Sequence, residues 1–166
     1  MAVAGHLSNT TLIDDLIKSG LLVQGAYIDG AWIGGCEDNV VDVYNPADGQ
    51  RIGSVPNLSA DEARTAVDAA SEAFDAWSNT LAHERAHKLR TWYELILAER
   101  DDLALLMTLE QGKPLAEARG EIEYAASFID WYAGEAGRLG VEGVTPHLEN
   151  RDMQVTREPL GVAALI

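Results

Sequence analysis

The chain has 166 residues, the length of one domain, and its 47% hydrophobic content excludes disorder as the default state because it supplies enough apolar material for a core. It carries 27 acidic and 12 basic residues, a formal charge of −15. That charge repels nucleic-acid phosphates and anionic membranes, so it argues against both as partners.

Targeting signals and cysteine usage indicate the cellular compartment of the protein. The first 20 residues lack the charged and apolar regions of a secretion signal. No apolar run approaches the roughly 18 residues that span a membrane. The single cysteine, Cys36, has no partner for an internal disulfide. These features predict a cytoplasmic protein.

The first predicted element is a short amphipathic helix in residues 11–20, TLIDDLIKSG. Helical spacing places Leu12, Leu16 and Ile17 on one side, and Gly20 stops the helix.

Two β-hairpins are expected next. Residues 27–33, YIDGAWI, predict two short arms around a tight Asp-Gly turn. Residues 40–56, VVDVYNPADGQRIGSVP, predict two further short strands, joined by the turn signals of an Asn-Pro and an Asp-Gly pair.

A helical region follows. Ser59 and Glu62 have the spacing of a capping box, in which each residue satisfies a backbone amide of the other. Apolar residues then recur at three- and four-residue steps and predict one apolar stripe. The stripe comprises Ala63, Ala66, Val67, Ala70, Phe74 and Trp77.

The helical pattern continues through residues 78–112, with a break expected near the Arg-Asp-Asp run at residues 100–102 and an end at Gly112. Its apolar positions are Leu89, Trp92, Ile96, Leu103 and Leu106. Pro114 suits the first turn of the next helix, where a missing N–H does no harm. The buried stripe expected for that helix is Leu115, Ala118, Ile122, Ala125, Ile129 and Ala136, with Gly137 and Gly140 loosening its end.

The period changes at the end of the chain. MQVTRE, residues 153–158, alternates as a strand does. GVAALI, residues 161–166, is a continuous apolar run, which predicts a strand covered on both faces in a parallel sheet. No further strands or crossover helices follow it in this sequence.

One motif invites a metal interpretation. His83, Glu84 and His87 match the His-Glu-x-x-His pattern, in which two imidazoles one helical turn apart bind zinc. Basic residues crowd the would-be cation: Arg85, Lys88 and Arg90. The remaining histidines, His6 and His147, fall in loop-like stretches, so a third ligand is not evident. We expect an exposed helix turn and no metal site; the alternative is a small metal hydrolase.

Other side chains with chemical potential stand in unsuitable surroundings. Glu117, Glu121 and Glu123 are better explained as a solvated face than as acid–base groups, since the first two lie opposite the apolar stripe. The glycines of GEAGRLG close a helix, which is the wrong context for phosphate binding. Two acidic neighbours of Cys36 disfavour a reactive thiolate there. The residues by themselves predict a helix-and-strand protein without a catalytic site.

Residues 108–136, TLEQGKPLAEARGEIEYAASFIDWYAGEA, closely resemble the aldehyde dehydrogenase superfamily. Further segments occur in the family's order and spacing: YIDGAWI, VYNPADGQRIGSVP, ADEARTAVDAASEAFDAW and REPLGVAALI. Within the superfamily the chain looks most like NAD(P)-dependent succinate-semialdehyde dehydrogenases, mainly because of LEQGKPLAEARGEIEYAASFIDW.

The resemblance implies an α/β chain, the N-terminal part of the aldehyde dehydrogenase fold. It would have β-hairpins, three main amphipathic helices and then the first strands leading into a Rossmann-like cofactor domain. Residues 1–166 would form a truncated N-terminal portion of the cofactor-binding domain, with the catalytic domain absent and part of the cover that the apolar stripe of residues 63–77 has in the family's full fold missing. The intact enzyme would be a homo-oligomer that oxidises a small aldehyde with NAD or NADP. Neither cofactor is expected to bind tightly to this chain.

The same resemblance assigns no catalytic residue to the chain. The family's oxyanion-holding Asn, cofactor-binding Lys, cofactor turn, general-base Glu and nucleophilic Cys would all follow Ile166. Cys36 does not match the position of the nucleophile.

A few marginal roles do carry over from the family. Gly120 and Tyr124 match a helix that lines the substrate tunnel, and Ile166 matches the end of the strand that leads into the cofactor site. Tyr44 and Glu110 match positions that help bind a structural monovalent cation in some members. For each of these residues the alternative is ordinary packing or a solvated side chain.

Three functions are therefore compared. The first is the N-terminal portion of an aldehyde dehydrogenase, inactive without the remainder. The second is a truncated, non-catalytic protein that at most associates with full-length subunits. The third is the metal hydrolase built on the His-Glu-x-x-His motif.

Overall fold

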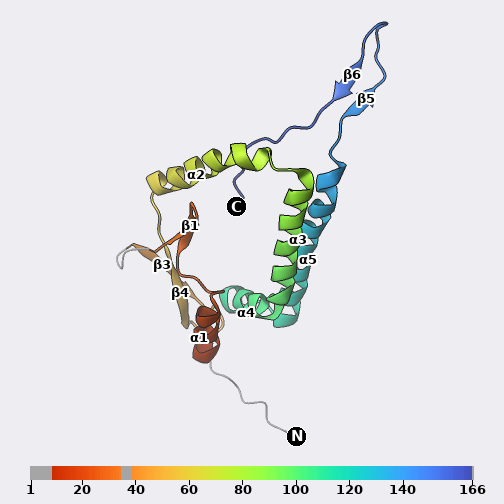
Figure 1. The fold of residues 1–166 in the computed structure, drawn as a ribbon. Coiled ribbons are helices and arrows are strands. Elements are labelled where there is room, and N and C mark those ends of the chain that lie inside the picture. Colours follow the sequence, from red (N-terminus) through yellow and green to blue (C-terminus); the bar gives the residue numbers. More distant parts are fainter. Residues whose placement is uncertain (1–8, 35–38, 166) are drawn as a thin grey trace.

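The computed structural model describes residues 9–34 and 39–165, which form five α-helices and three two-stranded antiparallel hairpins (Figure 1). The helices are α1 (Asn9–Ser19), α2 (Ala60–Ser78), α3 (Ala82–Ala98), α4 (Arg100–Gln111) and α5 (Leu115–Glu135), with a short 3-10 helix η1 (Ala136–Arg138). The strands are β1 (Ala26–Ile28), β2 (Ala31–Ile33), β3 (Val40–Tyr44), β4 (Arg51–Pro56), β5 (Glu142–Val144) and β6 (Met153–Val155). The mixed helix-and-strand class expected from the sequence is confirmed.

Helix α1 confirms the first predicted element, and Gly20 ends it with a φ of 81°. The buried face differs from the expected one. Ile13 and Leu16 are buried, whereas Ile17 is 41% exposed. The neighbours decide this orientation, because Ile13 and Leu16 pack with Ile52 of β4 and a leucine of α4.

Both N-terminal hairpins form as predicted. In the first, Asp29 and Gly30 have φ values of 48° and 77°, so both central turn residues adopt the left-handed conformation of a tight I′ turn. The second hairpin pairs β3 with β4 across the loop that begins at Asn45. The buried Asn45 side chain accepts a 2.9 Å hydrogen bond from the Ala47 N–H, which fixes the start of this loop.

The core of the chain is small and lies where α1, the β3–β4 hairpin and α4 meet. Four buried residues form it: Ile13, Leu16, Ile52 and Leu109. Partly buried apolar residues pack around them: Leu21, Leu22, Val43, Leu105 and Leu106. This cluster connects the β3–β4 hairpin to α1 and α4.

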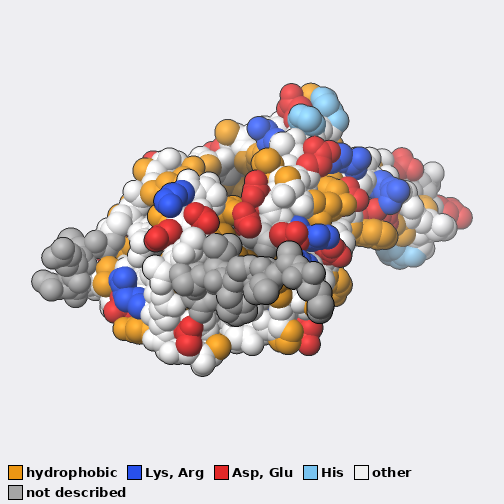
Figure 2. Space-filling model, turned by 90° about the horizontal axis from the view of Figure 1, so that it is seen from below, with side chains coloured by type: hydrophobic (Ala, Val, Ile, Leu, Met, Phe, Trp, Pro, Cys, Tyr) orange, Lys and Arg blue, Asp and Glu red, His pale blue; other side chains and the backbone are white. Residues whose placement is uncertain are grey.

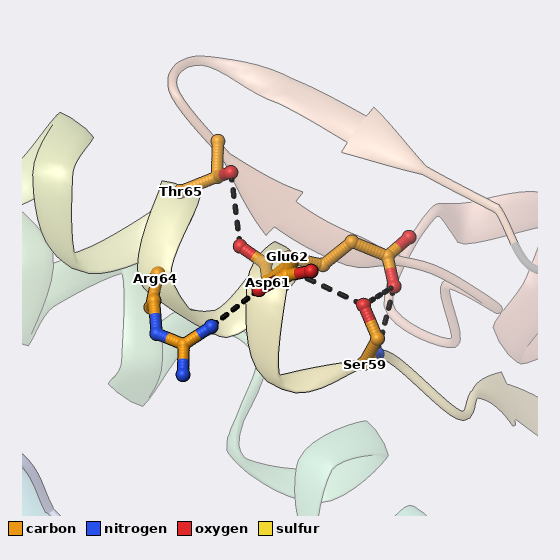
Figure 3. Close-up of polar contacts among 5 residues, drawn as sticks. All are labelled: Ser59, Asp61, Glu62, Arg64 and Thr65. Atoms are coloured by element: carbon orange, nitrogen blue, oxygen red, sulfur yellow. Dashed lines mark hydrogen bonds and ion pairs between the residues drawn. The ribbon is translucent and has the colours of Figure 1, made fainter.

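The predicted capping box opens α2 (Figure 3). The Ser59 hydroxyl accepts from the Glu62 N–H at 3.3 Å, and the Glu62 carboxylate accepts from the Ser59 N–H at 2.7 Å. The Ser59 hydroxyl also donates to the Glu62 carboxylate, at 2.8 Å. The bonds that the carboxylate accepts from the Ser59 N–H and hydroxyl lower the pKa of Glu62 below its ordinary value of 4.5, because they stabilise the charged form. The cap is therefore stronger when Glu62 is ionised.

The stripe on α2 forms but is not covered. No residue of α2 is buried, and Val67 and Trp77 remain 55% and 43% exposed. Two members of the stripe, Ala66 and Ala70, line an open groove with Ala69, Ala73 and the β1–β2 turn. The sequence predicted the helix and its apolar stripe correctly, and in the described part of the chain the β1–β2 turn lies beside this stripe without burying it.

The long helical region divides into α3 and α4 at Glu99, one residue before the predicted break. Gly112 ends α4 with a φ of 73°, and a Cβ atom there would lie 3.0 Å from Cγ of Pro46. Pro114 precedes the first turn of α5 instead of lying within it, with an extended ψ of 135°.

Helix α5 lies beside α3 and crosses α4 through small side chains (Figure 1). Ala118, Ala126 and Ala133 are buried at this contact. The predicted stripe included Ala125, which is exposed. The error is one residue, because the step after Ile122 is four positions instead of three.

Of the two strands predicted for the C-terminal region, one is confirmed and one is wrong. MQV of the predicted MQVTRE strand is β6, which pairs with β5, an element that the sequence did not reveal. Residues 156–165 have no regular structure, so the strand predicted for GVAALI is wrong in this structure. Leu160 and Leu165 are fully exposed. No described strand lies beside this segment to complete its hydrogen bonds.

The chain is unusually open. Its accessible surface is 12611 Å², whereas a compact monomer of 17.9 kDa exposes about 8,000 Å². Figure 2 shows apolar side chains lying among charged ones on the part of one face that the grey atoms do not cover. Among the described residues, no helix combines the length and apolarity needed to cross a membrane.

We expect Ser59→Ala to destabilise α2 by about 1 kcal/mol, because it removes an N-cap acceptor. Since the folded-state pKa of Glu62 is lowered, the reciprocal bond contributes fully above pH 4.5 and is lost as the pH falls through the folded-state value. Urea titrations followed by far-UV circular dichroism at pH 7 and pH 3 measure both effects. Ser71→Ala, at an exposed position inside α2, is the control. An equal loss in both variants would contradict the role of the cap.

We also expect the isolated chain to be poorly stable or to self-associate, and more so at high salt. Its exposed apolar surface favours association, and salt screens the opposing charge within about 10 Å at 0.1 M ionic strength. Size-exclusion chromatography with light scattering at low and high salt measures this. A sharp monomer peak in both, with cooperative thermal unfolding, would show an autonomous domain instead.

Candidate functional site

The candidate site is the exposed face of α5 that lies opposite its buried alanines. Gly120 and Tyr124, the two residues that family resemblance placed at a substrate tunnel, lie one helical turn apart on this face. Tyr124 is 66% exposed. No atom lies within 4 Å of a Cβ built on Gly120, so the surface beside Tyr124 is open at this position.

Aromatic residues extend this face along α5. The Tyr124 and Phe128 rings meet edge to face, with centroids 4.9 Å apart and an interplanar angle of 77°. Trp131 and Tyr132 follow, 65% and 62% exposed. We call Gly120, Tyr124, Phe128, Trp131 and Tyr132 the aromatic face. The sequence analysis missed its last three members, although positions four, seven and eight after Tyr124 repeat at helical spacing.

The opposite side of α5 holds the aromatic face in place. Alanine methyl groups let α5 approach α3 and α4 closely, since they are the smallest side chains with a Cβ. Ion pairs then fix the helix at the edges of this contact. They join Arg100 to Glu123, Arg119 to Asp101, Arg90 to Asp130 and Lys113 to Glu121.

Asp101 is the centre of the ion-pair network between α4 and α5. Its Oδ1 atom lies 3.0 Å from Arg100 Nη2 and 3.0 Å from Arg119 Nε. Hydrogen bonds from Arg100 and Arg119 lower the pKa of Asp101, and bonds to Glu123 and Asp101 raise the pKa of Arg100. Both shifts favour the charged forms of Asp101 and Arg100. Because they are solvated, their value lies in orientation more than in stability.

The carboxylates of α5 are solvated, and some of them also form ion pairs. Glu117, Glu121 and Glu123 are exposed, as the expectation of a solvated face requires. Glu121 and Glu123 also form the ion pairs with Lys113 and Arg100, which the sequence analysis did not foresee. Neither arrangement positions two carboxylates for acid–base work.

The suggested cation residues are not brought around one cavity. The Tyr44 hydroxyl donates to Asp42 Oδ2 at 3.3 Å and lies on the exposed side of β3. Glu110 lines a small cavity of about 140 Å³ with residues of the β3–β4 hairpin, and Tyr44 is not part of its wall. The described structure thus favours ordinary surface roles for this pair.

The His-Glu-x-x-His motif lies in the first two turns of α3. His83, Glu84, His87 and Lys88 line one open groove on the surface. No group of three or more histidine, cysteine or acidic residues suited to a metal ion occurs within residues 9–34 and 39–165. Lys88 also brings a positive charge to the groove. The hydrolase alternative gains no support from this geometry.

Two residues from the sequence analysis cannot be placed. Ile166, expected beside the cofactor site, and Cys36, expected to be inert, lie outside the described residues. What the described residues bring together is a wall of aromatic rings on a braced helix. Such a wall can bind an apolar part of a small molecule and exclude water, but it holds no nucleophile or base.

We expect no stoichiometric zinc at His83 and His87, since zinc sites in proteins are closed by three or four ligands. The chain is purified without an affinity tag and dialysed against equimolar zinc, and metal analysis then measures the zinc that stays bound. His147→Ala, outside the motif, is the matched control for His83→Ala. Zinc at one equivalent that is lost only in His83→Ala would restore the hydrolase alternative.

The sequence and the structure were compared with those of known proteins. The sequence model of the aldehyde dehydrogenase family matches residues 32–166. The chain is 49% identical over 151 residues to the NADP⁺ succinate-semialdehyde dehydrogenase of Escherichia coli, covering 91% of this chain and 31% of that protein. It is 49% identical over 146 residues to the glutarate-semialdehyde dehydrogenase of Pseudomonas aeruginosa, covering 88% of this chain and 30% of that protein.

A solved structure agrees with the sequence comparisons. The crystal structure of succinate-semialdehyde dehydrogenase from Burkholderia pseudomallei superposes with a TM-score of 0.80 at 45% identity, over 86% of this chain and 30% of that one. The chain thus spans about 30% of the length of the relatives it matches, and its architecture is that of the N-terminal part of their fold. On these findings, the chain belongs to the aldehyde dehydrogenase family.

Proposed function

We propose that residues 1–166 form the N-terminal portion of the cofactor-binding domain of an NAD(P)-dependent aldehyde dehydrogenase. The observation that carries the proposal is the 49% identity to the E. coli enzyme over 91% of the chain. The aromatic face of α5 lies within the matched family region.

The substrate class follows from the names of the relatives. Succinate semialdehyde and glutarate semialdehyde are both short aliphatic chains with an aldehyde at one end and a carboxylate at the other. We infer a substrate of this class. The aromatic face fits its methylene portion, because Tyr124 and Phe128 present apolar ring surface that is open on one side.

The family resemblance places the cofactor turn, the nucleophile and the base in the part of the fold that this chain does not cover. The proposal therefore assigns the oxidant NAD(P)⁺ and the reacting side chains to that part. This chain supplies the wall that orients the aldehyde and keeps water away from it.

The alternative, a non-catalytic protein that associates with full-length subunits, uses the same surfaces. It predicts binding without turnover of its own. The cytoplasmic location and the homo-oligomeric state expected for the intact enzyme remain predictions.

We expect the chain alone to produce no NAD(P)H from succinate semialdehyde, and a chimera to produce it. In the chimera, this chain replaces the matched region of the E. coli relative. The two catalysts differ only in the presence of the remaining fold, so the contrast isolates what that part contributes. Turnover by the chain alone that survives Cys36→Ser, or an inactive but correctly folded chimera, would contradict the proposal.

Within the chimera, Tyr124→Ala should raise KM several-fold with a smaller change in kcat, because it removes ring surface from the wall and leaves the reacting groups in place. Tyr124→Phe keeps the ring and is the matched control. Equal kinetics for Tyr124→Ala and the parent would separate Tyr124 from the substrate path.

A further inference from the structure

We infer that the imidazoles of His83 and His87 on α3 form a chelating site for copper(II), in which water completes the coordination of the ion. The inference goes beyond the proposed function, because it concerns a different helix and requires no part of the aldehyde chemistry. It also differs from the hydrolase alternative, which requires zinc, a third protein ligand and a catalytic base.

The backbone of α3 brings the two imidazoles to one place. His83 and His87 are four residues apart within this helix, so they project from the same face with Cβ atoms about 5–6 Å apart. Both residues are exposed and line one open groove. A metal ion can therefore reach both rings from solvent, and the helix holds the rings near each other before the ion arrives.

The basic residues around the motif are the argument against a cation, and the structure removes most of that argument. Arg85 Nη1 donates to the Thr80 carbonyl, so this guanidinium is directed back toward the start of the helix. Arg90 Nη2 lies 3.7 Å from Asp130 Oδ1, so its charge is turned toward α5. Neither arginine lines the groove that contains the two imidazoles.

The charge that remains on the groove is close to balanced. Lys88 lines the groove and contributes one positive charge, and Glu84 lines it as well and contributes one negative charge. The formal charge of the whole chain is −15, which attracts cations to its surface. The electrostatic surroundings therefore allow a divalent ion to bind between the imidazoles.

The number of ligands selects the metal. The part of the chain that the structure describes holds no group of three histidine, cysteine or acidic residues suited to a metal ion, so the site has two protein ligands. Zinc sites in proteins have three or four protein ligands, in agreement with the zinc prediction above. Copper(II) binds nitrogen ligands most tightly among the divalent first-row metals, and its tetragonal geometry leaves positions for water. Two imidazoles therefore favour copper(II) over nickel(II) and zinc.

The test is a copper(II) titration of the untagged chain near neutral pH, with glycine present to compete for weak sites, followed by electron paramagnetic resonance. We expect one copper(II) ion per chain, a Kd in the micromolar range and a spectrum of nitrogen ligation. His83→Ala and His87→Ala should each weaken binding at least about tenfold, because the second imidazole binds at a high effective concentration. Alanine favours helix, so α3 should persist in both variants. His147→Ala, outside the motif, should bind copper(II) as the parent does.

A spacing variant keeps the number of histidines unchanged. His87→Ala combined with Lys88→His places the second imidazole five residues after His83, on a different side of the helix. This variant also removes the positive charge of Lys88, which by itself would favour the cation. A loss of affinity therefore depends on the four-residue spacing and not on histidine content or charge.

The outcomes decide the inference without involving the proposed function. Weakened binding in both alanine variants and in the spacing variant, with unchanged binding by His147→Ala, supports the site. Absence of stoichiometric copper(II), equal binding by all variants, or a loss confined to His147→Ala would overturn it, since the last two results mean adventitious binding elsewhere on the chain. The activity of the chimera is measured without added copper, so failure here leaves that proposal standing.

Discussion

The close contact of α5 with α3 and α4 is the constraint on which the helical part of the structure depends. It is built from methyl groups: Ala118, Ala126 and Ala133 are buried, and no larger apolar side chain of α5 is. Small side chains bring helix axes near one another and leave little tolerance for added volume. Ion pairs from Arg100 to Glu123 and from Arg119 to Asp101 join α4 to α5 beside this contact and are consistent with the same rotation of α5, which decides which residues point outward.

The rotation of α5 determines which of its side chains form the candidate site. With its alanines inward, α5 must present Gly120, Tyr124 and Phe128 on the other side. The aromatic face is therefore a geometric consequence of the alanine contact. The charges support it without being buried, and their lowered or raised pKa values keep them ionised near neutral pH.

Local signals in the sequence predicted local structure well. The Asp-Gly turn, the capping box at Ser59 and the glycine at the end of α4 each act within a few residues, and each forms as expected. Signals that depend on neighbours were less reliable. GVAALI has the composition of a covered strand, but composition cannot supply the strand beside it. The stripe of α2 was predicted correctly as apolar, but helical spacing alone does not say what covers it.

The candidate site shows the same division. Gly120 and Tyr124 came from family resemblance, and the structure places them on one face. Phe128 and Trp131 belong to that face by simple helical spacing, but spacing alone does not distinguish a binding wall from ordinary packing. The ion pairs of Glu121 and Glu123 cross between elements and could not be derived from their positions on one helix.

Gly112 carries a consequence for how this chain can vary. Its backbone is left-handed, and a methyl group there would press against the ring of Pro46 from the β3–β4 loop. Asparagine, the usual substitute for a left-handed glycine, would relieve the first difficulty and aggravate the second. A larger residue at this position therefore displaces a loop more than sixty residues earlier in the chain by a few tenths of an ångström. The joint between α4 and α5 thus bears directly on the position of the β3–β4 loop.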